Sequence, residues 1–363
     1  MKKSLIALAV LAASGAAMAQ SSVTLYGVAD AAVTYVNGLD NWTGLNSGAN
    51  KTSRLGFRGV EDLGGGLKAN FVLEGGFNLD TGDGKSGGAT DSGFQFKRQS
   101  TVGLAGDFGE VRLGRELTAA YNATARYDVF GSVGIAHSQL WDDGQNLNTK
   151  TFADPYHYMP NSRVSNAITY VSPNFSGFKA AVNYGFGEIA GENRDGRYFG
   201  GGLTYDNGPL SLGLGAERLN KGDGAAMQAQ VSHDITAWSL GGSYDLGVAK
   251  LLAGYRQSTA KDVMGLGDMK NRGYMLAVTA PVGPGLVRAA YNRYETKFDG
   301  DKGVTDQFGL GYVYNLSKRT SVYGTYAYIK NKDDNALNLS VGSGGVKTNG
   351  SQQAVQVGVT HAF

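Results

Sequence analysis

The chain has 363 residues, with 56 glycines, 20 tyrosines, 15 phenylalanines and no cysteine, so no disulfide can hold it together. Its mean hydropathy is −0.23 and no internal run of 18 apolar residues occurs, which excludes membrane-spanning helices. The formal charge of +2 comes from two lysines among residues 1–19, and the remainder has 31 basic and 31 acidic residues, which argues against nucleic-acid binding.

Residues 1–19 have the pattern of a secretory signal peptide. Two lysines precede an apolar run over 5–13, and the tripeptide AMA at 17–19 offers a small-residue cleavage site. A short membrane anchor is the alternative, but the run is too short to span a bilayer. We therefore expect residues 1–19 to be removed on export and residues 20–363 to form one domain.

Alternation of large apolar residues with polar or small ones dominates the rest of the chain, as in 23–35, 54–60, 67–77 and 272–282. A period of two predicts β-strands. Seven short turn sequences separate pairs of strands, at 61–66, 106–109, 174–177, 206–209, 245–248, 282–285 and 315–319. With a first strand at 23–36 and a last at 352–363, the count is sixteen.

Longer polar stretches alternate with these turns. They lie at 37–50, 78–95, 116–160, 187–197, 220–236, 260–271, 298–304 and 332–350. An even number of strands, with short turns at one end and long loops at the other, is typical of outer-membrane barrels, in which closure removes every free edge. We predict an all-β fold, a 16-stranded antiparallel transmembrane β-barrel with short periplasmic turns and long external loops. A soluble sandwich or propeller is the alternative, but aromatic residues near strand ends favour a membrane barrel.

Five segments of the chain carry a family resemblance. They are SSVTLYGVADA at 21–31, SRLGFRGVEDLGGGLKANFVLEGGF at 53–77, FKRQSTVGL at 96–104, GDFGEVRLGR at 106–115 and the terminal Phe363. Together they resemble the general porins of β-proteobacteria, of the Neisseria and Burkholderia–Bordetella–Comamonas type. The resemblance implies a homotrimer in the outer membrane of a Gram-negative bacterium, passive diffusion of small hydrophilic solutes and ions, and a third loop folded into the lumen.

The stretch 116–160 is too long for a simple connection, and loops of this length are usually functional. Its acidic residues are Glu116, Asp128, Asp142, Asp143 and Asp154. The sequence YDVFGSVG at 127–134 resembles the segment with which porin constriction loops turn inside the barrel. We therefore expect 116–160 to be a constriction loop, with Asp128 the foremost candidate for an acid at the narrowest point. A solvated external loop is the alternative.

Strand alternation predicts which arginines face the lumen. In the strand that begins at Arg54, apolar residues alternate with Arg54 and Arg58, which therefore face inward. An outward Val164 would likewise leave Arg163 inside. Strict alternation puts Arg98 outside, whereas the resemblance implies an inward arginine there, and a bulge would reconcile the two. Arg54, Arg98 and Arg163 match positions where anion-preferring relatives place an arginine cluster opposite the third loop.

Five further bases sit one or two residues into the strands that leave the turns, namely Lys68, Arg112, Lys179, Lys250 and Arg288. Their neighbours are apolar, so alternation turns all five inward, as a basic collar at the periplasmic mouth. Cations snorkelling at the membrane edge are the alternative. Charged groups in a narrow wet pore bias which ions enter, so we expect a modest anion preference.

The two ends of the chain carry further signals. Gly27, Ala29 and Ala31 present small side chains on one face of the first strand, where another backbone could approach closely, so we expect a trimer interface there. The last strand, AVQVGVTHAF, must pair with the first to close the barrel. The resemblance implies that Phe363 is part of the signal read by the outer-membrane assembly machinery. Outer-membrane lipid and lipopolysaccharide are the other expected partners.

Catalysis has little support in the sequence. The four histidines fall in no recognisable catalytic spacing, no G-x-S-x-G motif occurs, and without cysteine a metal site is poorly supported. We expect no enzyme activity, cofactor or metal. Two other functions remain open: a substrate-specific channel, whose conductance a given solute would block, and a surface adhesin or receptor barrel, which would show no large conductance.

Overall fold

The computed structural model describes residues 22–84, 93–141, 162–192, 194–220, 234–339 and 345–363. In these residues the first eight strands are β1 (Ser22–Asn37), β2 (Trp42–Ser47), β3 (Arg54–Gly64), β4 (Leu67–Gly76), β5 (Gln99–Gly106), β6 (Gly109–Leu117), β7 (Arg163–Val171) and β8 (Phe178–Gly185). They are followed by β9 (Tyr198–Asn207), β10 (Leu210–Leu219), β11 (Ile235–Asp245), β12 (Lys250–Ala260), β13 (Met269–Val282), β14 (Gly285–Phe298), β15 (Asp301–Asn315), β16 (Thr320–Lys332) and β17 (Ser351–Ala362). The helices are short: α2 (Ala119–Thr124), η1 (Ala125–Tyr127), η2 (Gln139–Trp141) and η3 (Val263–Gly265).

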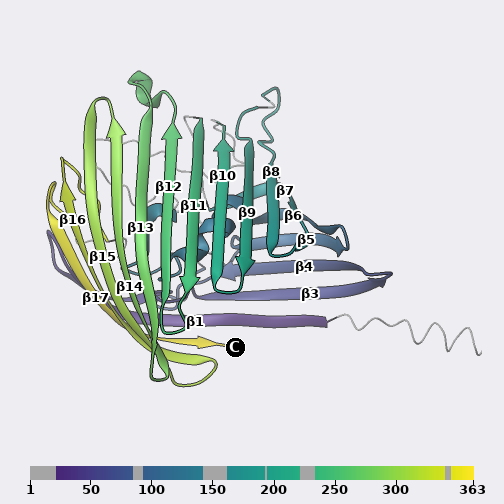
Figure 1. The fold of residues 1–363 in the computed structure, drawn as a ribbon, viewed down its shortest axis with the longest axis horizontal. Coiled ribbons are helices and arrows are strands. Elements are labelled where there is room, and N and C mark those ends of the chain that lie inside the picture. Colours follow the sequence, from purple (N-terminus) through teal and green to yellow (C-terminus); the bar gives the residue numbers. More distant parts are fainter. Residues whose placement is uncertain (1–21, 85–92, 142–161, 193, 221–233, 340–344) are drawn as a thin grey trace, which may run out of the picture.

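The strands form one antiparallel sheet that closes on itself, because β17 pairs with β1 from Val28 to Asn37 (Figure 1). Sixteen strands run around the barrel, as predicted. The seventeenth, β2, is a six-residue strand within the first loop, and it pairs with the second half of β1 while β3 pairs with the first half. No helix among the described residues is long and apolar enough to cross a membrane.

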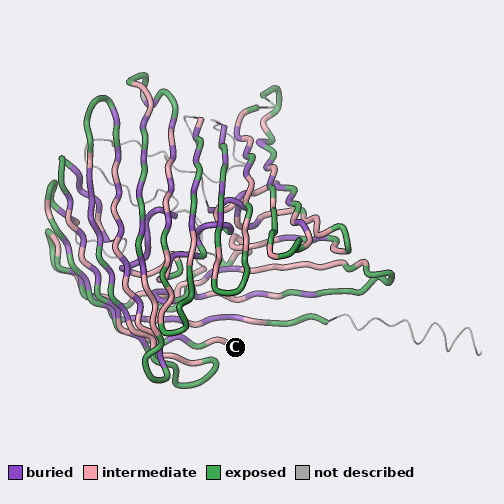
Figure 2. The backbone as a smooth tube through the Cα atoms, in the orientation of Figure 1, coloured by how far each residue is buried: buried purple, intermediate pink, exposed green. Residues whose placement is uncertain are grey.

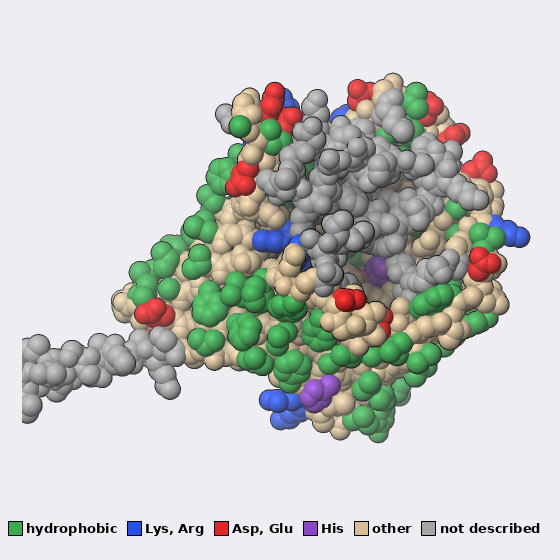
Figure 3. Space-filling model, turned by 180° about the vertical axis from the view of Figure 1, so that it is seen from behind, with side chains coloured by type: hydrophobic (Ala, Val, Ile, Leu, Met, Phe, Trp, Pro, Cys, Tyr) green, Lys and Arg blue, Asp and Glu red, His purple; other side chains and the backbone are tan. Residues whose placement is uncertain are grey.

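Burial alternates along the strands, as Figure 2 shows by its colours. On β17, Val355, Val357 and Val359 are 46–60% exposed on the outer face, whereas Gln356 and Thr360 are almost fully buried on the inner face. Side chains of a strand point to opposite faces in turn. The apolar side chains therefore cover the outside of the barrel and the polar ones line the inside, which is the reverse of a soluble protein. Seen from behind, the outer surface shows a broad band of hydrophobic side chains with charged groups at its ends (Figure 3).

Two local features depart from the sequence predictions. The stretch 298–304 is no long loop, because only Asp299 and Gly300 connect β14 to β15. Both have positive φ, 48° and 84°, as a two-residue hairpin turn of type I′ requires. On β7, Asn166 has a φ of 52° and the register with β6 shifts between Gly114 and Glu116. Such a bulge reverses the alternation of side chains beyond it.

The apolar core lies inside the barrel, where the third loop packs against the wall. Tyr127, Phe130 and Leu140 from the loop are at most 3% exposed and cluster with Met275 and Ile329 from the strands. Figure 1 shows the short helices of this loop in the interior, behind β9 to β12. Thr118 caps α2, since its hydroxyl accepts a hydrogen bond from the Tyr121 N–H at 3.2 Å. The described part of the loop, up to Trp141, therefore packs against one side of the barrel interior.

Candidate pore constriction

One part of the inner wall gathers basic side chains around a single carboxylate, that of Glu74 on β4. Arg98 Nε lies 2.7 Å from Glu74 Oε1, and Arg54 Nε lies 3.4 Å from Oε2. The Tyr26 hydroxyl donates to the same oxygen at 3.0 Å. Arg58 Cζ lies 5.2 Å from the centre of the Tyr26 ring, within the range of a cation–π contact. The wall therefore carries three guanidinium groups against one carboxylate.

The third loop is seated on the inner wall of β9 to β15, at glycines. A Cβ added at Gly202 or Gly213 would clash with backbone carbonyls of α2, one added at Gly241 with the Tyr127 ring, and one at Gly254 with Trp141. Gly309 and Gly311 make room for Phe130 in the same way. A strand glycine often marks close approach of another backbone. Part of the high glycine content thus serves to accommodate the loop within the barrel.

Buried polar groups hold the loop in this seat. Arg256 on β12 donates from Nη1 to the Leu140 carbonyl at 2.9 Å, and its Nη2 lies 2.8 Å from Glu217 Oε1 on β10. The side chains of this ion pair are only 5% and 4% exposed. The Gln139 N–H donates to the Tyr294 hydroxyl at 2.8 Å. The wall therefore fixes the loop by charge and hydrogen bonding as well as by fit.

These features, a closed barrel with an inward loop facing a basic wall, agree with the comparison with known sequences. A sequence model of the Gram-negative porin family matches residues 5–334. The chain belongs to the Gram-negative porin family. This porin is 46% identical to outer membrane porin protein 32 of Delftia acidovorans over the whole of both chains. It is 32% identical to an outer membrane porin protein of Bordetella pertussis, with 91% of this chain and 95% of the relative covered.

A solved structure supports the same conclusion. The anion-selective porin from Comamonas acidovorans matches with a TM-score of 0.81 and 42% identity, over 95% of this porin and all of that chain. The fold and family predicted from the sequence are therefore confirmed, and the outer membrane of a Gram-negative bacterium is where the porin resides. Among the described residues, no group of three or more His, Asp or Glu is placed to hold a metal ion.

Two of the predicted loop acids, Glu116 and Asp128, are buried in this porin. Asp128 is 6% exposed, and its carboxylate accepts hydrogen bonds from the N–H groups of Phe130, Ser132 and Ser138 at 2.9–3.0 Å. Burial raises the pKa of the Asp128 carboxyl, although these bonds oppose the shift. Glu116 is 4% exposed and pairs with Arg112 at 2.7 Å. The prediction of Asp128 as an acid at the narrowest point of the pore is therefore wrong, because its carboxylate is buried and bonded to backbone N–H groups of its own loop. The Glu116 carboxylate is buried in the same way and paired with Arg112. Asp142, Asp143 and Asp154 lie outside the described residues, as does the predicted signal peptide.

The wall arginines follow alternation only in part. Arg98 precedes the first residue of β5, where the backbone is irregular, and its side chain reaches the inward carboxylate of Glu74. On β7 the bulge at Asn166 turns Val164 inward, 1% exposed among core residues, so the alternation from which Arg163 was placed does not hold there, and its lumen position stays a prediction. Arg163 still lies beside Arg98, since its Nε donates to the Arg98 carbonyl at 2.9 Å.

All five bases predicted to form a collar lie on inner-face positions, but they do not form a continuous ring. Arg112 pairs with Glu110 and Glu116, both at 2.7 Å. Arg288 is 8% exposed and lies under the loop, with Cζ 4.9 Å from the centre of the Phe130 ring. Lys68 and Lys179 are exposed, and Lys250 lies 3.6 Å from Asp245. Two of the five therefore support the third loop and its root.

The closing seam of this porin is sealed by its last residue. The Gly27 N–H donates to the Phe363 carbonyl at 3.2 Å, and the Phe363 N–H donates to the Gly27 carbonyl at 3.1 Å. The Phe363 ring covers Gly27 so closely that a Cβ there would clash with it. Gly27 is thus covered by Phe363 within the chain, and its place in a trimer interface stays a prediction. Ala29 and Ala31 remain half-buried on the outer face.

Sequence reasoning missed the partners that organise the site. Tyr26 and Glu74 occupy inner-face positions by simple alternation within 23–35 and 67–77, so the pattern contained a signal for both. No local pattern pointed to the ion pair of Arg256 and Glu217, which are 39 residues apart.

Proposed function

We propose that this porin is a water-filled channel that passes small hydrophilic solutes and ions by passive diffusion and prefers anions. The observation that carries the preference is the wall of Arg54, Arg58 and Arg98 with Glu74 as the acid among them. Arg54 and Arg98 keep 28% and 21% of their side chains exposed, so their charge is felt in the lumen.

Fixed positive charge in a narrow wet passage raises the local concentration of anions and lowers that of cations. The described part of the third loop offers no opposing exposed acid, because Glu116 and Asp128 are buried. Its exposed base, Arg126, pairs with Asp206 of the wall. The similarity to an anion-selective porin structure at 42% identity supports the same sign of selectivity.

The test is the reversal potential of the purified porin in planar bilayers under a KCl gradient. We expect the sign for chloride preference in the wild type and a shift toward zero in the double variant Arg54→Gln/Arg98→Gln, which leaves one guanidinium against one carboxylate. The matched control is Arg272→Gln/Arg293→Gln, which removes two charges from the outer face. Cation preference in the wild type, or an unchanged potential in the first variant, would refute the proposal.

The assembly of the porin is a second part of the proposal. We propose that the porin forms a homotrimer in which Ala29 and Ala31, on the outer face of β1, lie at the interface. Their small side chains would let a neighbouring subunit approach closely. Replacement of Ala29 by Trp should then abolish heat-stable oligomer bands on gels, and intact trimers would contradict this. Phe363, the last residue of the chain, is proposed to be part of the signal that the outer-membrane assembly machinery recognises. Lipopolysaccharide is the proposed lipid neighbour.

A further inference from the structure

One fully buried carboxylate, that of Asp30 on β1, is not among the residues of the basic wall. Asp30 is 0% exposed. Its Oδ1 accepts hydrogen bonds from the N–H groups of Ala49 and Asn50 at 2.7 and 3.2 Å, and its Oδ2 accepts one from the Lys51 N–H at 3.3 Å. These three residues belong to the connection between β2 and β3 in the first loop. The first-loop turn, residues 48–51, is therefore folded around a single acid.

The same carboxylate also bonds to the last two strands of the barrel. Thr360 on β17, which pairs with Asp30 in register, donates its hydroxyl to Oδ2, and the Tyr323 hydroxyl on β16 donates to Oδ1 at 2.8 Å. Tyr323 reaches across β17 because its partner there is Gly358, where a Cβ would lie 2.5 Å from the Tyr323 oxygen. Asp30 therefore connects the first-loop turn to the strands that close the barrel.

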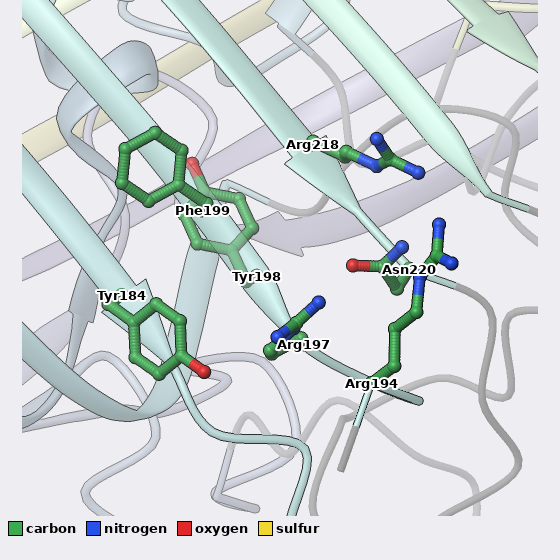
Figure 4. A pocket seen from close by; sticks show the side chains of 7 residues that line it. All are labelled: Tyr184, Arg194, Arg197, Tyr198, Phe199, Arg218 and Asn220. Atoms are coloured by element: carbon green, nitrogen blue, oxygen red, sulfur yellow. The ribbon is translucent and has the colours of Figure 1, made fainter. Parts of the chain in front are cut away.

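All five donors to Asp30 are neutral groups, and both carboxylate oxygens act only as acceptors, as in an ionised acid. Glu217 differs, because it has an ion pair with Arg256 as well as a hydrogen bond from the Tyr198 hydroxyl at 2.9 Å. Figure 4 shows Tyr198 among the residues that line a pocket of about 360 Å³ at the loop end of β9 and β10. A buried charge is tolerated only when it is paired or hydrogen-bonded. Release of the turn would remove three donors from Asp30, so turn and carboxylate stabilise each other.

The first-loop turn is in direct contact with the third loop. A Cβ added at Gly134 of the third loop would collide with the Ala49 carbonyl, so the two backbones touch. Gly134 has a φ of 74°, which glycine adopts without strain. Directly after it, the carbonyls of Ile135 and His137 accept hydrogen bonds from Gln307 on β15 at 3.4 and 3.1 Å. This part of the third loop therefore lies between the wall at β15 and the turn that Asp30 holds.

We propose that Asp30 is a positioning residue for permeation, which fixes the first-loop turn as the support on which the third loop rests. Pairing of β17 with β1 brings Thr360 to Asp30, and β16 brings Tyr323. The completed site then holds the turn against Gly134. Closure of the barrel and the width of the pore thus depend on one carboxylate. The inference rests on the proposed function as a channel, but not on the preference for anions.

The test is single-channel recording of the purified Asp30→Asn porin in planar bilayers. The amide replaces one acceptor oxygen by an NH₂ group, which cannot accept the N–H bonds of the turn. Loss of a hydrogen bond to a charged group shifts an equilibrium by roughly tenfold or more, so we expect current fluctuations to become more frequent by that factor. The matched control is Asp62→Asn. The Asp62 carboxylate holds the turn between β3 and β4 through the Gly64 N–H at 2.9 Å, and this variant should record like the wild type.

A reversible disulfide separates support of the third loop from closure of the barrel. The hydroxyl oxygens of Ser47 and Ser53, on either side of the turn, lie 2.9 Å apart, so cysteines there are within reach of a disulfide. The chain has no other cysteine. In Asp30→Asn/Ser47→Cys/Ser53→Cys, the oxidised porin should record as steadily as the wild type, and a reductant should bring the fluctuations back. Because this disulfide joins nothing on β16 or β17, a defect in closure alone would not be rescued.

Ser53→Ala is a second, milder variant that serves if Asp30→Asn inserts poorly. It removes the two hydrogen bonds, at 3.1 and 3.0 Å, between the Ser53 hydroxyl and the backbone of Asp30, and it should also make fluctuations more frequent. Steady current in both variants, or fluctuations that persist in the oxidised disulfide variant, would overturn the proposal. A wild type without conductance would overturn the channel function as well, whereas the other two results would leave that function intact.

Discussion

The most informative perturbation of this porin is removal of Arg256, which joins the wall to the third loop. Arg256→Leu takes away the donor to the Leu140 carbonyl and leaves Glu217, 4% exposed, without its guanidinium partner at 2.8 Å. Breaking a buried pair by removing one member costs about 3–5 kcal/mol. Backbone hydrogen bonds join every strand of the barrel to its neighbours. We therefore expect the lost free energy to detach the third loop from the wall rather than to unfold the barrel.

A cost of about 3 kcal/mol raises the detached fraction of the loop more than a hundredfold, at tenfold for each 1.4 kcal/mol. Single-channel recordings should therefore change from steady current to frequent fluctuations. The double variant Arg256→Leu/Glu217→Leu removes both charges and should recover part of the steadiness, because replacement of a whole buried pair by apolar residues is close to neutral. If recordings of Arg256→Leu match the wild type in conductance and noise, the pair of Arg256 and Glu217 does not hold the third loop against the wall.

Three further outcomes are expected. Asp128→Asn should leave the reversal potential unchanged, because the carboxylate is buried, while current noise rises since one oxygen cannot accept all three N–H bonds; a shift in selectivity would contradict this. Gly213→Val should push α2 away from the wall toward the lumen and lower the single-channel conductance, whereas Gly324→Val, on β16 where nothing lies close to the added Cβ, serves as control for the effect of valine in a strand. Deletion of Phe363 removes both backbone bonds to Gly27 and should lower the yield of inserted porin on gels of membrane fractions; normal yield would count against an assembly role.

Much of the barrel could be predicted because its rules are local. Alternation follows from strand geometry, and sequences such as EDLGGG at 61–66 end one strand and begin the next without help from distant residues. The inner-face placement of Arg54 and Arg58 needed nothing more than this period. Where the backbone departs from the period, as at Asn166, a single bulge placed Val164 inside the barrel, opposite to the inferred face.

The inside of the pore was harder to predict because it depends on contacts between distant segments. The sequence shows that 116–160 is long and acidic, but not that Asp128 bonds to its own loop. Nor does it show that Arg288, 160 residues further along, lies beneath Phe130 rather than in an open collar. Only the paths of both segments in space decide which charges remain exposed to ions.

The sequence by itself therefore determined the number of strands, their outward apolar faces and the closure of the last strand on the first, because period-two patterning and turn chemistry act over a few residues. The tertiary structure alone decided which charged side chains are free. Ion pairs such as that of Arg256 and Glu217 form across strands that the barrel brings together, and the seat of the third loop depends on glycines from several strands at once. A group of charges contributes to selectivity when it is exposed and its bases and acids do not cancel, and both properties depend on neighbours that the chain supplies from elsewhere.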